Sequence, residues 1–226
     1  MIDKLLKYIA PHPCISCDDL NGPLCDNCKY NIINEGFDGC VACGKGLGLK
    51  GLCGRCRVPY ERAWCVGLRE AELELLIDRY KFHRLKSASE PLNSLLSEVL
   101  PDLPSETMVV PVPTIRKHIR QRGYDHAALL AKGVATEKGL HYYPALQRSS
   151  QAVQHLASRR DRIKQAKEAF SCGVELDPEI PYLLVDDIVT TGSTIRYAAK
   201  ALRESGARTI WVAVIARQPT GKTDKM

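Results

Sequence analysis

Two adjacent carboxylates followed by a loop of small hydroxyl residues are the part of this chain best suited to chemistry. An apolar run from Tyr182 ends in Asp186 and Asp187, and the loop 190–194 comes next. A helical pattern starts at Ile195, so backbone N–H groups at the helix start can face an anion. Two carboxylates would repel a phosphate unless they bind something else, such as vicinal sugar hydroxyls beside a divalent cation. These residues therefore indicate a phosphorylated sugar as the ligand.

The loop itself reads Thr190-Thr191-Gly192-Ser193-Thr194. Gly192 lets the backbone turn tightly and approach a ligand, and the hydroxyls add hydrogen-bond donors for the same phosphate. The alternative is a buried strand that leads into a capped helix, with Asp187 or Ser193 as the cap. A cap needs one polar residue and not six, which favours the phosphate site.

Residues 183–195 resemble the PRPP-binding motif of type I phosphoribosyltransferases, which is a hydrophobic strand, two acids and Thr-Thr-Gly-Ser-Thr. In that family the acids hold the ribose 2- and 3-hydroxyls and the loop holds the 5-phosphate. The resemblance implies these roles for Asp186 and Asp187, which are also the candidate catalytic residues, and for the loop 190–194. It further implies Mg²⁺ between the carboxylates and the phosphates of PRPP.

Eight of the ten cysteines form four Cys-x-x-Cys pairs near the N-terminus. Such pairs place two sulfurs on one metal ion, and zinc is the expected metal where thiols stay reduced. The pairs are Cys14/Cys17, Cys25/Cys28, Cys40/Cys43 and Cys53/Cys56. Their repeated spacing favours two tandem zinc ribbons in which neighbouring pairs share an ion, although a cross-braced or outer-with-inner pairing also fits. Redox-active dithiols are the less favoured alternative. The sequence thus predicts two structural zinc ions.

Composition and periodicity divide the chain into three parts. Few large apolar residues lie between the cysteines, so a metal must supply folding free energy to a small zinc-ribbon domain over residues 1–60. Strand and helix patterns alternate from residue 63 onward, which predicts an α/β domain with a mostly parallel sheet flanked by helices over residues 63–217. Residues 218–226 are polar and are predicted to be a disordered tail.

The α/β part contains recognisable strands and helices. We predict strands at residues 63–68, 170–174, 182–185 and 209–216 and a further strand from residue 108 that prolines 111 and 113 end. We predict helices at 70–84, 89–99 and 195–202 and a further helix that residues 124–126 open and Gly139 closes. Ligands of parallel sheets bind at the carboxyl ends of strands, so Pro111 and Asp186 are expected to line one crevice.

Two basic stretches offer partners for phosphate. Residues 114–122 contain Arg116, Lys117, Arg120 and Arg122 and no acid. Arginine meets phosphate oxygens two at a time, so this segment, together with Pro113, is predicted to bind the pyrophosphate of PRPP. The second stretch holds Arg148, Arg159, Arg160, Arg162, Lys164 and Lys167 and is equally consistent with a solvated helical face. Neither stretch supplies an evident base for an acceptor.

Several segments together resemble the ComF family, in which a double zinc ribbon precedes a phosphoribosyltransferase-type domain. The matching segments are the cysteine pairs, 80–83, 110–113, 122–124, Gln154 with Leu156, Arg162, 169–170 and 183–195. The resemblance spans about residues 14–217 and adds Lys81 to the PRPP site. It implies a link to DNA uptake in natural transformation. It leaves open whether the chain is an enzyme, namely a phosphoribosyltransferase, because function depends on the site and not on the fold.

This chain departs from the family pattern at two places. Asp125 and His126 stand where the family reads Asn-Gln, and Gln165 stands where it reads Asn. Asp125 would bring a carboxylate to the pyrophosphate side of the site.

The second hypothesis is a non-catalytic competence component that binds single-stranded DNA through the zinc ribbons and the basic stretches. The net charge of +6 supports it only weakly, because two four-cysteine zinc sites lower the charge to about +2. The two Trp, nine Tyr and three Phe are also not interleaved with the basic residues. We read no signal peptide and no apolar run of membrane length, so we expect a cytoplasmic protein without membrane insertion. Its expected partners are PRPP, single-stranded DNA and other DNA-uptake proteins.

Overall fold

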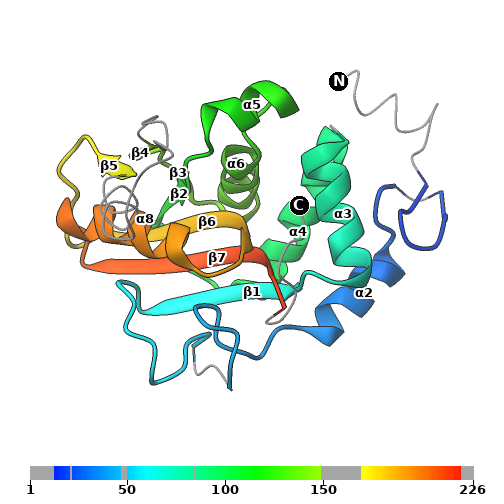
Figure 1. Cartoon of the computed structure of the whole chain (residues 1–226), viewed down its shortest axis with the longest axis horizontal. Helices are drawn as coiled ribbons and strands as arrows, with labels where there is room; N and C mark the ends of the chain where they lie inside the picture. Colours follow the sequence, from blue (N-terminus) through cyan, green and yellow to red (C-terminus); the bar gives the residue numbers. More distant parts are fainter. Residues whose placement is uncertain (1–12, 21, 47–49, 84, 149–168, 220–226) are drawn as a thin grey trace, which may run out of the picture.

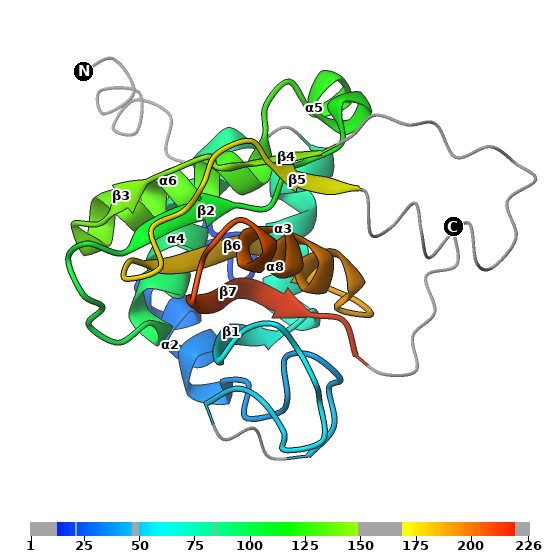
Figure 2. The ribbon, with the colours of Figure 1, turned by 90° about the vertical axis from the view of Figure 1, so that its left-hand side faces the viewer.

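A computed structural model of the chain describes residues 13–20, 22–46, 50–83, 85–148 and 169–219. Five parallel strands form its central sheet in the order β1-β7-β6-β2-β3 (Figures 1 and 2). The strands are β1 (Arg62–Leu68), β2 (Met108–Pro111), β3 (His141–Tyr142), β6 (Pro181–Val189) and β7 (Thr209–Arg217). The two longest strands, β6 and β7, are buried on both faces, which explains their nearly continuous apolar sequence.

Helices cover both faces of this sheet (Figure 1). One face carries α3 (Ala71–Phe82), the 3₁₀ turn η1 (Lys86–Ala88), α4 (Ser89–Val99) and α6 (His126–Lys138), with α2 (Asp26–Glu35) beside β1. The other face carries α8 (Ser193–Glu204) and the antiparallel pair β4 (Leu146–Arg148) and β5 (Phe170–Cys172). The short helix α5 (Arg116–Arg122) follows β2. The predicted α/β fold with a mostly parallel sheet flanked by helices is therefore confirmed.

Three local features differ from the sequence predictions. The central strand does not end at the acidic pair but continues through it to Val189. The basic segment after Pro113 forms the helix α5, which the periodicity could not reveal because α5 buries none of its seven described residues. The short strands β3 and β4 were also not predicted, since two or three residues are too few to show a period.

The N-terminal cysteine segment packs against the sheet domain at two places. The first two cysteine pairs join the apolar cluster of α3 and α4, and Lys29 forms an ion pair of 2.6 Å with Glu98. The last two pairs lie along β1, where the Ala63 N–H donates to the Lys50 carbonyl at 3.0 Å. This contact covers part of the sheet edge, which would otherwise offer unpaired backbone groups. Within the described ranges, no helix has the length and apolar character to span a bilayer.

Candidate functional site

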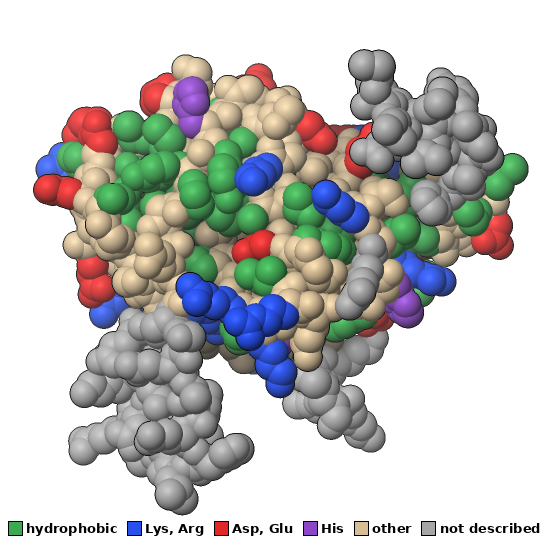
Figure 3. Space-filling model, turned by 90° about the horizontal axis from the view of Figure 1, so that it is seen from above, with side chains coloured by type: hydrophobic (Ala, Val, Ile, Leu, Met, Phe, Trp, Pro, Cys, Tyr) green, Lys and Arg blue, Asp and Glu red, His purple; other side chains and the backbone are tan. Residues whose placement is uncertain are grey.

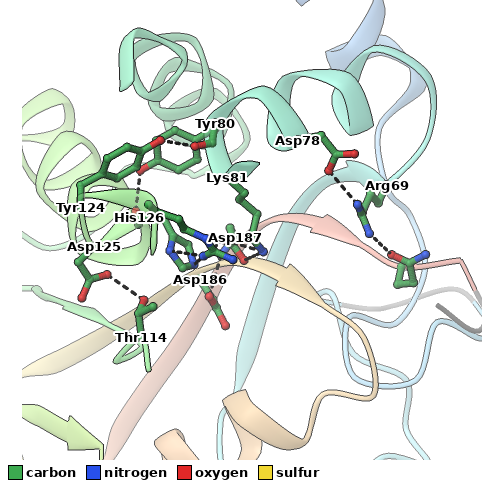
Figure 4. Close-up of polar contacts among 12 residues, drawn as sticks. Arg69, Asp78, Tyr80, Lys81, Thr114, Tyr124, Asp125, His126, Asp186 and Asp187 are labelled. Carbon is green, nitrogen blue, oxygen red and sulfur yellow. Dashed lines mark hydrogen bonds and ion pairs between the residues drawn. The ribbon is translucent and has the colours of Figure 1, made fainter. Parts of the chain in front are cut away.

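The acidic pair lies in the middle strand, near its carboxyl end and inside the protein. Asp186 is 9% exposed and Asp187 is 4% exposed. Lys81 Nζ, on α3, lies 3.1 Å from the Asp187 carboxylate, and His126 Nε2, on α6, lies 2.8 Å from it (Figure 4). The Asp186 carboxylate accepts a hydrogen bond from the Asp187 N–H at 2.9 Å. Three elements far apart in the sequence therefore converge on one buried carboxylate.

The pleat of β6 gives the two carboxylates different surroundings. Val185 packs with the helices α3 and α6, whereas Leu184 packs with α8. Side chains alternate along a strand, so Asp187 shares the face of Val185 and Asp186 shares the face of Leu184. The contacts of Asp187 with Lys81 and His126 agree with this placement. The two acids are therefore neighbours with separate partners.

His126 connects the acidic pair to the basic helix α5. The Arg122 guanidinium lies 2.8 Å from His126 Nδ1. The same guanidinium nitrogen lies 3.2 Å from Nε2, the ring nitrogen that contacts the Asp187 carboxylate. Sequence reasoning noted His126 only as a departure from a family pattern. Its role in the site depends on a contact between α6 and β6 that local sequence does not encode.

The two carboxyls have opposite pKa shifts. Burial, and then the charge of Asp187, raises the pKa of Asp186 well above its usual range. Burial would also raise the pKa of Asp187, but the charge of Lys81 and the contact with His126 outweigh it and lower this pKa below its usual range. The free site therefore holds Asp187 firmly ionised and resists a second negative charge on Asp186.

The hydroxyl loop lies directly beyond this pair, at the start of α8. Gly192 has a φ of +75° and occupies the N-cap position without a side chain to fill it. Thr190, Thr191 and Ser193 are exposed, and Thr191 Oγ1 lies 3.0 Å from Ser193 Oγ. The first turn of α8 therefore presents N–H groups and hydroxyls to an incoming anion.

The structure separates the residues that were predicted to bind pyrophosphate. Pro111 pairs with Val185, so the end of β2 lies beside Asp186 as expected, and Pro113 follows it. Arg122 points toward His126 and the acidic pair. Arg116 and Arg120 are exposed and, with Lys117 and Gln121, line an open hollow of about 450 Å³ on α5. Figure 3, which looks down on this side of the molecule, shows several groups of Lys and Arg side chains.

Asp125 has a local structural role. Its carboxylate accepts hydrogen bonds from the Ala128 N–H at 3.1 Å and from Thr114 Oγ1 at 2.9 Å. It is thus the N-cap of α6 and fixes the chain that leads into α5. The second departure, Gln165, lies outside the described residues, as do Gln154, Leu156, Arg162 and most of the second basic stretch.

The eight paired cysteines form two clusters that suit a tetrahedral metal. Cys14, Cys17, Cys25 and Cys28 form the first cluster, and Cys40, Cys43, Cys53 and Cys56 form the second. The Cys40–Cys56 and Cys43–Cys53 sulfurs lie 3.8 Å apart, and the Cys17–Cys25 sulfurs 3.5 Å. Four sulfurs at about 2.3 Å from zinc are about 3.8 Å from one another, whereas a disulfide needs about 2.05 Å. Both clusters fit zinc, in the sequential grouping that the spacing favours.

The comparisons with known proteins agree with this arrangement. Residues 182–226 match the family model for the phosphoribosyl transferase domain. The chain is 33% identical over 215 residues to competence protein F of Haemophilus influenzae, covering 86% of this chain and 90% of that protein. It is 30% identical over 206 residues to the DNA utilization protein YhgH of Salmonella typhi, with the same coverage. Competence protein ComFC of Streptococcus pneumoniae is 27% identical over 198 residues, with 83% of this chain and 84% of that protein covered.

These relatives are matched over 84–90% of their own length, and the family model covers the part of the chain that carries the acidic pair. The chain therefore belongs to the ComF family, and it combines two four-cysteine clusters with a phosphoribosyltransferase domain.

Proposed function

We propose that this protein binds PRPP, together with Mg²⁺, at the carboxyl end of β6 and acts in the uptake or use of DNA. The observation that carries the proposal is the buried pair Asp186 and Asp187 directly before a hydroxyl-rich helix start whose N-cap residue, Gly192, has no side chain. Burying a carboxylate costs free energy of folding unless the carboxylate is paired. A role in binding a ligand explains why the protein tolerates this cost. The names of the relatives, competence protein and DNA utilization protein, support the second half of the proposal.

In this proposal each part of the site has a role. The loop 190–194 binds the 5-phosphate, and Asp186 and Asp187 bind the ribose hydroxyls. Lys81 and His126 hold the Asp187 carboxylate in place. Arg122 contacts His126, which in turn contacts Asp187, so we assign the pyrophosphate to Arg122 first and to the exposed Arg116 and Arg120 after movement of α5.

The oxygen donors of the acidic pair fit a hard cation such as Mg²⁺. Asp187 already contacts Lys81 and His126, so Asp186 is the carboxylate that is left to share the cation with the phosphates of PRPP. When bound, the cation would neutralise charge on the pyrophosphate.

Calorimetric titration with PRPP and Mg²⁺ tests the proposal. We expect the wild type to bind, and the double variant Asp186→Asn/Asp187→Asn to bind about 100-fold more weakly or not at all, because hydrogen bonds to charged groups are lost. Asp102→Asn, the same change at a fully exposed carboxylate, is the control and should bind like the wild type. Absence of binding by the wild type, or equal binding by all three, would contradict the proposal. Release of pyrophosphate only when an acceptor is added would extend the proposal from binding to transfer.

A second candidate function is binding of single-stranded DNA along α5. The fold brings an aromatic ring beside a cation, although the two are not interleaved in the sequence. Phe82 is 62% exposed, and its ring lies 5.6 Å from the Arg122 guanidinium carbon. An exposed aromatic ring beside a cation suits a stacked base, and the exposed Arg116 and Arg120 suit the neighbouring phosphates.

Filter binding of an oligothymidylate over a range of salt concentrations tests this function. We expect Arg116→Gln/Arg120→Gln to reduce the slope of log affinity against log salt by about 1.4, since each lost phosphate contact removes about 0.7 for a single strand. Phe82→Ala should weaken binding without changing the slope. Lys200→Gln, on α8, is the control for a lost surface charge. No binding, or a slope that none of these changes alters, would argue against the function.

A further inference from the structure

The second cysteine cluster directly supports the phosphate loop. Val41 and Ala42 form the turn between Cys40 and Cys43, and Val41 is buried to 1% exposure. A methyl group added at Gly192 would lie 3.1 Å from the Ala42 carbonyl oxygen. This distance is shorter than most real contacts of such a methyl, so the metal-binding turn packs closely against the glycine of the loop. The loop thus has a wall that comes from the N-terminal segment.

A buried arginine connects the same turn to the end of the sheet. Arg217 is the last residue of β7, is paired in register with Val189, and is 3% exposed. One of its guanidinium N–H groups donates to the Val41 carbonyl. Among the residues that the structure describes, no carboxylate forms an ion pair with it. A buried guanidinium needs a counter-charge, and four thiolates with one zinc ion carry a net charge of −2.

The position of Arg217 fits this role. The Val41 carbonyl that accepts from Arg217 belongs to the residue next to Cys40, and Val41 lies in the same buried cluster as Tyr60 and Val189. The guanidinium therefore lies beside the turn that joins Cys40 and Cys43 of the second cluster. Val189, beside Arg217 in the sheet, is the residue before the loop 190–194. The Arg217 side chain thus links the charge of the second cluster to the position of the loop.

In the part of the chain that the structure describes, the first cluster has no such connection to the loop. Its cysteines Cys14, Cys25 and Cys28 pack with α3 and α4 on the opposite face of the sheet from α8. Ser16 donates to Glu72 on α3 at 3.1 Å. Loss of metal from this cluster should loosen the helices that it contacts and leave the start of α8 unchanged.

We propose that Val41, Ala42 and Arg217 are positioning residues that couple the second cysteine cluster to the phosphate loop, so that ligand binding at residues 190–194 depends on metal in the second cluster and not in the first. The part of this inference that concerns ligand affinity rests on the proposed PRPP site. The part that concerns the loop itself does not, because it can be measured without a ligand.

Hydrogen exchange of the full chain, combined with native mass spectrometry for zinc content, tests the coupling. Cys43→Ser and Cys17→Ser make the same change in the second and the first cluster. Each should leave one zinc ion, but only Cys43→Ser should speed exchange of the amides of residues 189–196, by about tenfold. The affinity for PRPP should fall by a similar factor in Cys43→Ser alone. Unchanged loop exchange after loss of the second zinc ion, or equal loosening in both variants, overturns the proposal.

Variants of Arg217 keep the test valid if Cys43→Ser fails to fold. Arg217→Met keeps all eight paired cysteines but removes the cation, and should speed exchange of the loop amides while two zinc ions remain. Arg217→Lys restores a cation and should return most of the protection. Wild-type exchange rates in Arg217→Met would overturn the coupling. If the wild type binds no PRPP, the proposed function fails, whereas the exchange measurements on the free protein still decide the coupling.

Discussion

Asp186→Asn is expected to raise the thermal stability of the ligand-free protein at pH 8, whereas Asp187→Asn is expected to lower it. The two residues are adjacent and both buried, so a simple count of buried groups predicts no difference. The difference arises because Asp187 forms an ion pair of 3.1 Å with Lys81, whereas no cation of the described residues forms an ion pair with Asp186. The pair therefore tests whether the electrostatics of the site are as the structure shows them.

For Asp186, burial and the neighbouring Asp187 raise the pKa in the folded state. A carboxyl whose pKa is raised in the folded state binds its proton more tightly there than in the unfolded chain. It therefore costs the protein no stability below about pH 4, and it lowers the stability as the pH rises. Asparagine cannot ionise and keeps an oxygen that can accept from the Asp187 N–H. We expect a gain of about 1–2 kcal/mol at pH 8, or several degrees in melting temperature.

For Asp187, the folded pKa is lowered, so its contribution to stability is present above about pH 4 and is lost only as the pH falls below that. Asparagine leaves Lys81, whose side chain is only 13% exposed, without its carboxylate. Breaking a buried pair in this way costs about 3–5 kcal/mol. The loss should be clear at pH 5 and at pH 8.

Thermal unfolding of the wild type, the two variants and the control Asp102→Asn at pH 5 and pH 8 measures both effects. The advantage of Asp186→Asn should shrink at pH 5, where the wild-type Asp186 keeps its proton, and Asp102→Asn should match the wild type throughout. Shifts of the same sign in the two variants would refute this account of the site. Since Asp186 is also proposed to bind the ligand, a stabilising Asp186→Asn that loses PRPP binding would show stability sacrificed for function.

The parts of this site that the sequence predicts are those that local spacing encodes. The acidic pair, the loop 190–194 and the sequential grouping of the cysteines all depend on residues within a few positions of one another. Lys81 and Asp187 lie 106 residues apart, and a resemblance to a family, not periodicity, brought Lys81 into the site. His126 and Arg217 were missed because each acts through a contact between distant elements. Arg217 follows an apolar run and looks like the mere end of a strand.

The basic helix shows a second limit. Four cations within residues 114–122 suggest a single anion site, but a helix turns its side chains in different directions. Arg122 therefore faces His126, while Arg116 and Arg120 face solvent. Charge composition predicts that a segment binds anions, and only the backbone conformation decides how many sites it forms.

The largest effect on stability is expected from Gly51→Ala. Gly51 has a φ of +73°, and a methyl group there would lie 1.7 Å from the Ala63 carbonyl oxygen of β1. A backbone atom cannot move aside as a flexible side chain can, so the two segments must separate. The contacts at stake are those of Val41 N–H to the Gly51 carbonyl, at 2.9 Å, and of Ala63 N–H to the Lys50 carbonyl, at 3.0 Å. We expect the second cysteine cluster to lose its attachment to β1.

Gly46→Ala separates this clash from backbone strain. Gly46 has a similar φ of +68°, but no heavy atom of the described residues lies within 4 Å of an added methyl group. It should cost only the strain of a left-handed alanine, about 1–2 kcal/mol. Gly51→Ala should cost more than 4 kcal/mol, which is rare for a single substitution, and should release one zinc ion to a chelator faster than the wild type.

Because Val41 belongs to the segment that Gly51 holds, the same variant should also expose the loop 190–194 to faster hydrogen exchange. Gly46→Ala should leave that loop protected. Equal unfolding temperatures for Gly51→Ala and Gly46→Ala would mean that the segment of the second cysteine cluster is not fixed to β1. The phosphate loop would then lack the support that the metal-binding turn gives it.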